Sequence, residues 1–421
     1  MNAKPASEWA IGAEIELFAF THDTLERISP EQVQQVITGF AEEIIETRAE
    51  DDFITEATLA ESRLTLEPGG QIEFSLYPKR SLADIERILE SYFSRLKELG
   101  EQLGILFLAT GFDPLRTIEE QHWIAKRRYD IMRPYLAKRG KRAWDMMCRT
   151  AAIQVNLDYS DLEDLAKKFT LANRLAPVAA AIFANSPFAE GKLSGYKSTR
   201  YATWLETDAE RTGAALCALD GAFSIERYID YVKSVPMFFI RRDKQYINLA
   251  GYDFSKFLAQ GYEGHTPIAQ DFTDQLSTIF TEARLKPYIE QRSMDCGHLE
   301  LTMAAMAFWK GLLCDCEALE NALEIAPKLN SQTYAALQLE TARHGLQAKL
   351  GDVAVLDTAM AAVEIARDGL KRIAPDETPY LDPLAAYIIH EKICPADVLI
   401  KNFRGRWHGD IQKAIDYLQL S

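Results

Sequence analysis

Three segments far apart in the chain alternate apolar with polar residues, and this alternation constrains the fold more than any other feature. In "IGAEIELF" (residues 11–18), Ile15 and Leu17 occupy one face of a strand, while Glu14 and Glu16 occupy the other. Two carboxylates on one face repel each other unless water or a cation lies between them. The segment therefore predicts a half-buried strand whose acidic face meets either solvent or a metal ion.

The second segment, "LEPGGQIEFS" (residues 66–75), has a Pro-Gly-Gly sequence between Glu67 and Glu73. Proline and glycine do not continue a regular strand, so this sequence predicts a turn or kink between two strand pieces. As structure alone, it is a hairpin with acidic residues facing water. As function, the two glutamates complete with those of the first segment an oxygen-rich site suited to hard divalent cations such as magnesium.

The third segment, "AAIQVNLDY" (residues 151–159), alternates apolar residues with Gln154, Asn156 and Asp158. A row of hydrogen-bonding groups therefore shares one face of a predicted strand. Three strands with polar inner faces predict a cavity lined by those faces.

A fourth stretch, "EARLKPYIEQRSMD" (residues 282–295), interleaves acid and base as Arg284, Lys286, Glu290 and Arg292. Each of these charges alone is typical of a protein surface. Together with the three alternating segments, they predict a strand or strand-to-loop segment that holds a metal carboxylate and grips phosphates with arginine.

Composition and charge exclude several classes of protein. The net charge of −15 argues against broad nucleic-acid binding, which normally uses a basic face. No apolar run approaches the roughly 18 residues that a membrane span needs. The N-terminal sequence lacks an apolar core followed by a small-residue cleavage site, which predicts a cytoplasmic location. Neither a P-loop, a G-x-G-x-x-G fingerprint nor an H-E-x-x-H motif is present.

The six cysteines are scattered, and only Cys314 and Cys316 are close in sequence. A single C-x-C pair without a histidine cluster is a weak zinc signal, so we expect buried or free thiols. Redox activation through a disulfide is not predicted.

The chain shows no linker or internal repeat, which predicts a single catalytic domain over residues 1–421 with a helical C-terminal part from about residue 300. Residues 84–103 carry an apolar stripe at helical spacing, and the apolar run that follows predicts a strand. Residues 357–373 predict an amphipathic helix. The acidic stretch 42–52 predicts a solvated helix face or loop.

With these segments in hand, the sequence resembles the plant-type glutamate–cysteine ligases, within the carboxylate–amine ligase family related to glutamine synthetase. The matching stretches keep their order along the chain and include "IGAEIELF", "LEPGGQIEFS", "RYDIMRPY", "DMMCRTAAIQVNLD", "ANSPFAEGK" and "TIFTEARLKPYIEQRSMD". The resemblance implies an α+β fold in which a curved, mostly antiparallel sheet forms a funnel-shaped active site. Helices surround that sheet, and the C-terminal region is helical.

The resemblance also implies the activity. Such enzymes bind ATP with two or three Mg2+ ions, for which Mn2+ is an alternative, and phosphorylate the γ-carboxylate of glutamate. The amine of cysteine then attacks the acyl phosphate, in the first step of glutathione biosynthesis. The implied partners are these small molecules, with no nucleic acid and no membrane, and the enzyme could be a monomer or a homodimer.

Residue roles follow from the resemblance position by position. The implied metal ligands are Glu14, Glu16, Glu67, Glu73 and Glu290. The implied catalytic residues, which stabilise charge on the transferred phosphate, are Arg284 and Arg292. The implied contacts to the nucleotide and the cavity floor are Gln154, Asn156 and Lys286. The implied substrate-binding residues are the carboxylate clamps Arg128 and Arg200 and the pocket residues Trp204, Met147 and Phe238.

Some positions depart from the family pattern. Phe238 stands where a tyrosine is frequent, Ile15 and Leu17 replace polar residues, and Gln275 stands where a histidine is usual. These departures keep open a related ligase that joins glutamate or another carboxylate to a different amine. Two further alternatives are a non-catalytic, nucleotide-binding regulator and a structural protein stabilised by zinc or disulfides.

Overall fold

A nine-stranded sheet forms the centre of the protein, which a computed structural model describes over residues 3–220, 223–243 and 245–420. Its strand order is β14-β15-β7-β1-β5-β4-β3-β2, with β6 also paired to β1, and neighbouring strands run antiparallel. The strands are β1 (Ile11–Thr21), β2 (Glu46–Glu50), β3 (Phe53–Thr58), β4 (Ser62–Leu66), β5 (Ile72–Leu76), β6 (Ile105–Leu108), β7 (Ala152–Leu157), β14 (Ala283–Leu285) and β15 (Ile289–Asp295). The predicted α+β fold built on an antiparallel sheet is confirmed.

The strand register brings the predicted polar faces together. Glu16 lies opposite Glu73 on β5, and Glu14 lies opposite Gln154 on β7. On the far side of β7, Asn156 lies opposite Glu290 of β15. Because side chains of paired residues point to the same face, the four strands place their polar rows side by side.

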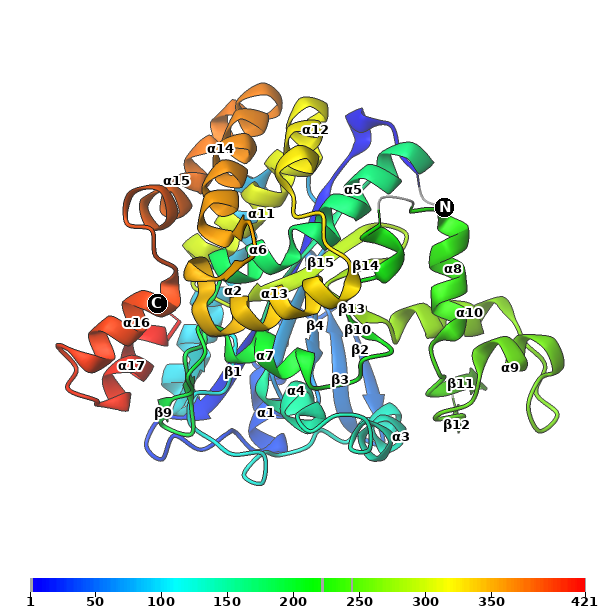
Figure 1. Cartoon of the computed structure of the whole chain (residues 1–421). Coiled ribbons are helices and arrows are strands. Elements are labelled where there is room, and N and C mark those ends of the chain that lie inside the picture. The colour runs from blue at the N-terminus through cyan, green and yellow to red at the C-terminus, as the bar shows by residue number, and fades with distance from the viewer. Residues whose placement is uncertain (1–2, 221–222, 244, 421) are drawn as a thin grey trace.

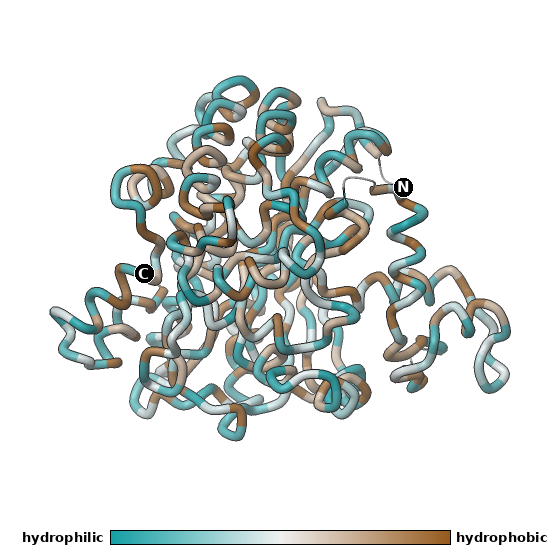
Figure 2. The backbone as a smooth tube through the Cα atoms, in the orientation of Figure 1, coloured by the Kyte–Doolittle hydropathy of each residue, from teal (hydrophilic) through white to brown (hydrophobic). Residues whose placement is uncertain are grey.

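Helices cover the other face of the sheet (Figure 1). Among them, α11 (Leu299–Leu313) is buried along nearly its whole length and contacts β1, β7 and the outer helix α14 (Val355–Ile373). The predicted helix 84–103 is α2 (Leu82–Leu103), which ends at Gly104 in the left-handed conformation that glycine tolerates. The hydropathy trace shows apolar segments at this interface and polar segments on the outer turns (Figure 2).

The remaining helices and strands before residue 299 connect the strands of the central sheet. They are α1 (Pro30–Thr38), α3 (Arg127–Leu136), α4 (Ala143–Arg149), α5 (Leu162–Arg174), α6 (Ala176–Ile182), β8 (Phe188–Ala189), β9 (Lys192–Leu193), α7 (Thr199–Leu205), β10 (Thr212–Gly213), α8 (Ile225–Ser234), β11 (Phe239–Arg242), β12 (Gln245–Asn248), α9 (Phe254–Gln260), α10 (Ala269–Ser277) and β13 (Phe280–Thr281). Elements α8 to α10 with the β11–β12 hairpin project as an arm at the right of Figure 1.

After α11 the chain is mostly helical, as predicted. The elements are α12 (Cys316–Ile325), α13 (Ser331–His344), β16 (Lys349–Leu350), β17 (Val353–Ala354), α14, α15 (Asp382–Leu384), α16 (Pro395–Arg404) and α17 (Ile411–Leu418). None of the helices in the described part of the chain has the length and apolar content to span a bilayer.

The acidic stretch 42–52 and the six cysteines are the subject of two further predictions. The acidic stretch 42–52 contains the exposed strand β2, so the prediction of a helix face or loop is wrong. Pairing with β3 satisfies the backbone of this polar edge strand, and local sequence pattern gives no sign of that pairing. All six cysteines are free thiols, as expected.

Candidate active site

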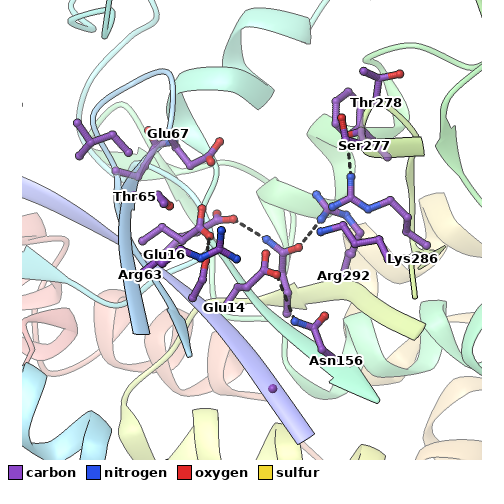
Figure 3. Close-up of a pocket in the computed structure, with 18 of the residues that line it drawn as sticks. Glu14, Glu16, Arg63, Thr65, Glu67, Asn156, Ser277, Thr278, Lys286 and Arg292 are labelled. Atoms are coloured by element: carbon purple, nitrogen blue, oxygen red, sulfur yellow. Dashed lines mark hydrogen bonds between the residues drawn. The ribbon is translucent and has the colours of Figure 1, made fainter. Parts of the chain in front are cut away.

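The polar face of the sheet forms the floor of a cavity of about 660 Å³. Strands β1, β4, β5 and β7 contribute the floor, and residues of α3, α4 and α7 contribute walls. Figure 3 shows side chains from these strands pointing into one space. The predicted cavity exists, and all predicted site residues except Phe238 and Glu290 line it.

Two of the predicted metal ligands are buried beside each other. Glu16 accepts hydrogen bonds from the backbone N–H of Ala152 at 2.8 Å and from Gln154 Nε2 at 2.9 Å. Burial, together with the charges of Glu67 and Glu73, raises the pKa of Glu16 to about 8. Burial and Glu67 likewise raise the pKa of Glu73 to about 7. These carboxylates therefore repel one another without a counter-charge.

Glu14 lies two residues before Glu16, on the same face of β1. It accepts a hydrogen bond from Asn156 Nδ2 at 3.2 Å, and burial followed by the charge of Glu290 raises its pKa. The carbonyl oxygen of the Asn156 side chain is buried without a hydrogen-bond partner. Oxygen donors in excess of positive charge are what a hard divalent cation requires.

The carboxylates of the described residues do not converge on a single metal-binding point. Among the described residues, no group of three or more His, Cys, Asp or Glu side chains is arranged closely enough to hold an ion. The donors fit magnesium in chemical type, because an ion between them would relieve their repulsion. In the structure these carboxylates line the cavity without meeting at one point.

Glu290 differs from the predicted metal ligand, because both of its oxygens are already paired. Oε2 accepts from Arg284 Nε at 2.5 Å and from Arg292 Nη1 at 2.9 Å, while Oε1 pairs with Lys286 Nζ at 2.6 Å. Burial opposes ionisation, yet the three cations hold the pKa of Glu290 well below its usual range. Glu290 therefore does not line the cavity, and in the structure its carboxylate anchors three cations.

The anchored cations form one end of the cavity. Arg292 also donates to the side chain of Gln154, and Arg284 donates to the carbonyl oxygens of Ser277 at 2.9 Å and Ile279 at 3.1 Å. These hydrogen bonds fix the guanidiniums of Arg284 and Arg292 in orientation, and Figure 3 shows Arg292 beside Lys286. Fixed cations facing a cavity suit polyanionic groups such as phosphates.

The cavity lining also combines two further arginines with aromatic and methionine side chains. Arg200 Nη2 donates to the carbonyl oxygen of Arg292 at 2.7 Å, while its Nε has no hydrogen-bond partner. Arg128 bonds the hydroxyl of Tyr129 at 2.8 Å and likewise leaves its buried Nε unpartnered. Trp204 and Met147 line the same cavity. Buried guanidiniums with free donors suit carboxylates.

Phe238 lies outside the cavity, so its predicted place in the pocket is wrong. Its ring is fully buried, 5.3 Å from the ring of Tyr135, and the Arg211 guanidinium lies 3.9 Å above it. The next residue, Phe239, lines the cavity instead. Successive side chains of extended backbone point in opposite directions, and sequence alone did not show which of the two faces inward.

The other departures from the family pattern also lie away from the cavity. Ile15 and Leu17 are fully buried on the opposite face of β1, against the helices. Gln275 is buried in the arm, where its amide donates to the carbonyl oxygen of Val235 at 2.7 Å. None of these three residues lines the cavity.

Replacing Phe239 by alanine is expected to raise the KM of an amino-acid substrate about tenfold or more, because a lost apolar wall contact costs about 1–3 kcal/mol. The KM for ATP should change little. In the matched variant Phe238→Leu, we expect a lower melting temperature with unchanged KM values. Steady-state kinetics of both variants would measure this, and an altered amino-acid KM only in Phe238→Leu would contradict the assignment.

The cavity lining includes residues that the motif analysis did not single out. Lys126 is buried, its Nζ donates to the carbonyl oxygen of Leu66 at 2.7 Å, and burial lowers its pKa to about 8. Tyr77 and Tyr288 line the cavity from loops. The basic cluster "AKRRYD" contained a signal for Lys126, whereas the tyrosines lay outside any periodic pattern.

A solved structure with this architecture is the glutamate–cysteine ligase from Francisella tularensis in complex with AMP. The two share a TM-score of 0.59 and 14% sequence identity, over 97% of this chain and 88% of that chain. This likeness shows that the two chains share a fold.

The family model described as glutamate-cysteine ligase family 2 matches residues 10–416. Glutamate–cysteine ligase B, chloroplastic, of Oryza sativa subsp. japonica is 36% identical over 419 residues, covering 99% of this chain and 84% of the relative. The chloroplastic enzyme of Nicotiana tabacum is 35% identical over 421 residues, covering 99% and 80%. The chain belongs to glutamate–cysteine ligase family 2.

The comparison corrects the predicted location. The plant relatives that match at similar identity are all described as chloroplastic, which overturns the cytoplasmic prediction. That prediction rested on a missing secretory signal. Organelle transit segments are amphipathic and lack the apolar core of such a signal, so its absence does not distinguish the two compartments.

Proposed function

We propose that this protein is an ATP-dependent ligase that joins the γ-carboxylate of glutamate to the amine of cysteine through a γ-glutamyl phosphate. The observation that carries the proposal is that carboxylates, the anchored cations and two further arginines beside aromatic side chains all line one cavity. Family membership over residues 10–416 supports the same reaction. The product would be the first intermediate of glutathione biosynthesis.

Glu14, Glu16, Glu67 and Glu73 would hold magnesium, two or three ions in number, with manganese as an alternative. When bound, such ions neutralise the repulsion between a triphosphate and a carboxylate and polarise the phosphoryl oxygens. The raised pKa values of Glu16 and Glu73 support this role, because they arise first from burial and then from neighbouring carboxylates, and a bound cation would favour the charged forms.

The anchored cations Arg284, Lys286 and Arg292 would bind the phosphates and stabilise the charge that builds up during transfer. Glu290 keeps all three in place, so little reorganisation is needed when the phosphate moves. Gln154 and Asn156 orient Glu16 and Glu14 on the floor.

Arg128 and Arg200 would bind the carboxylates of the amino acids through their unpartnered Nε–H groups. Trp204 and Met147 would exclude water around the attacking amine. Water exclusion protects an acyl phosphate from hydrolysis and strengthens the surrounding electrostatic interactions.

Cysteine is favoured over a different acceptor amine. The alternative rested on Ile15, Leu17, Phe238 and Gln275, and none of the four lines the cavity. A substitution outside the cavity does not remove a hydrogen bond to the acceptor.

The test is phosphate release from ATP, Mg2+ and glutamate with cysteine or one of a panel of other amines, followed by mass spectrometry of the product. We expect release that requires cysteine, with γ-glutamylcysteine as the product. Release that requires another amine would replace the acceptor and keep the mechanism. No release with any amine would support the regulator hypothesis.

A further inference from the structure

The polar face of β1 continues beyond the cavity as an aromatic platform. At period two, Phe18 and Phe20 follow Glu14 and Glu16 on the same side of the strand. Both rings are fully buried. The guanidinium of Arg27 lies over them, with its Cζ atom 4.9 Å and 5.2 Å from the two ring centroids. Stacking of this kind holds a buried guanidinium in a defined plane.

Arg27 uses that platform to reach the segment that carries Glu67. The residue is 3% exposed, and its Nη2 donates to the carbonyl oxygen of Gly69 at 2.7 Å. Its charge is balanced by Asp113, whose Oδ2 lies 3.5 Å from Nη1. Nε makes no hydrogen bond. The hydrogen bond to Gly69 is therefore the specific contact of this buried cation.

Residues 66–71, which we call the Glu67 loop, are held from behind at three carbonyl groups. Lys126 Nζ donates to the carbonyl oxygen of Leu66 at 2.7 Å, and the Ile124 N–H donates to that of Pro68 at 2.8 Å. Arg27 donates to the carbonyl oxygen of Gly69. The loop is also pressed against α4, since a Cβ on Gly69 would lie 2.5 Å from the Cys148 carbonyl oxygen. With its backbone fixed, the loop presents the Glu67 side chain to the cavity (Figure 3).

We propose that Arg27 is a positioning residue that fixes the Glu67 loop and thereby sets Glu67 for metal binding. The inference rests on the proposed role of Glu67 as a metal ligand. Arg27 does not line the cavity and contacts no substrate position. Partners that orient a ligand from behind typically change metal affinity or activity about 10- to 100-fold when removed.

The experiment measures Mn2+ binding by calorimetry in the presence of a non-hydrolysable ATP analogue, alongside melting temperature and kcat. The variants are Arg27→Met, which keeps an unbranched apolar stem, and Arg27→Lys, which keeps a charge and a donor. The matched control is Arg174, a second buried arginine that donates to a backbone carbonyl, that of Leu219, at 2.9 Å. It does not line the cavity, so Arg174→Met and Arg174→Lys report the structural cost alone.

We expect about a tenfold or greater loss of Mn2+ affinity in Arg27→Met, with partial rescue in Arg27→Lys, and unchanged affinity in both Arg174 variants. In a Glu67→Gln background, Arg27→Lys should produce little further loss, since both act on the same ligand. Should Arg27→Met fail to fold, Arg27→Lys carries the test.

A lower melting temperature with unchanged Mn2+ affinity in Arg27→Met, or in Arg27→Lys where Arg27→Met does not fold, would overturn the proposal and leave Arg27 a structural residue. Absence of Mn2+ binding by the wild-type protein would also overturn it. Failure of the proposed function has a different signature, because Mn2+ binding would persist while no amine supported product formation.

Discussion

Replacing Glu67 by glutamine is expected to reduce kcat at least about a hundredfold while leaving the melting temperature nearly unchanged, because a lost metal ligand removes charge stabilisation worth several kcal/mol. Glutamine has nearly the same volume, and the Glu67 loop is held through backbone carbonyls. The fold therefore does not depend on the carboxylate charge. Magnesium titrations of ATP turnover would show the loss and a higher magnesium requirement.

Glu377→Gln is a suitable control for this variant. Glu377 is a buried glutamate that accepts from the Leu82 N–H at the start of α2 and pairs with Lys310 at 2.6 Å, away from the cavity. We expect it to lower stability without changing the magnesium requirement. Unchanged kcat and magnesium dependence in Glu67→Gln would sink the metal assignment of this residue.

The second large effect is expected for Glu290→Gln, with a loss of about 3–5 kcal/mol in the free energy of unfolding, because three cations lose their buried counter-charge. Glu290 is 0% exposed, so bulk solvent does not screen the unpaired cations. Turnover should fall as well, since Arg284 and Arg292 lose the group that fixes them. Denaturant unfolding and ATP turnover would measure the two effects.

A matched control is Asp271→Asn, which removes a buried carboxylate that binds both terminal nitrogens of Arg242 at 2.6 Å and 2.8 Å in the arm. This control should lose stability and retain turnover. If Glu290→Gln were instead as stable as the wild type but failed to bind Mn2+, Glu290 would be a metal ligand after all, and its present ion pairs would rearrange on metal binding.

Local pattern in the sequence predicted most of the elements that build the site. Period-two alternation located β1 and β7, and the Pro-Gly-Gly sequence located the turn before β5. Helical spacing located α2 and α14. These features depend on neighbours within a few residues, so the printed order of residues carries them directly.

Errors arose where the partner lies far away in the chain. The exposed strand β2 exists because β3 pairs with it, and Phe238 points away from the cavity because Tyr135 and Arg211 enclose its ring. No sequence motif contains Arg27, because its contact is a hydrogen bond to Gly69, 42 residues away in the chain. Such contacts depend on how strands and loops pack, which periodicity does not describe.

The sequence by itself determined that carboxylates and amides line the inner face of a sheet and that cations alternate with acid near residue 290. Only the tertiary structure decided which charge neutralises which. Glu290 is paired with three cations, whereas burial and neighbouring carboxylates raise the pKa values of Glu16 and Glu73. The physical reason is that electrostatic interaction depends on distance and burial, and folding sets both for residues far apart in the chain.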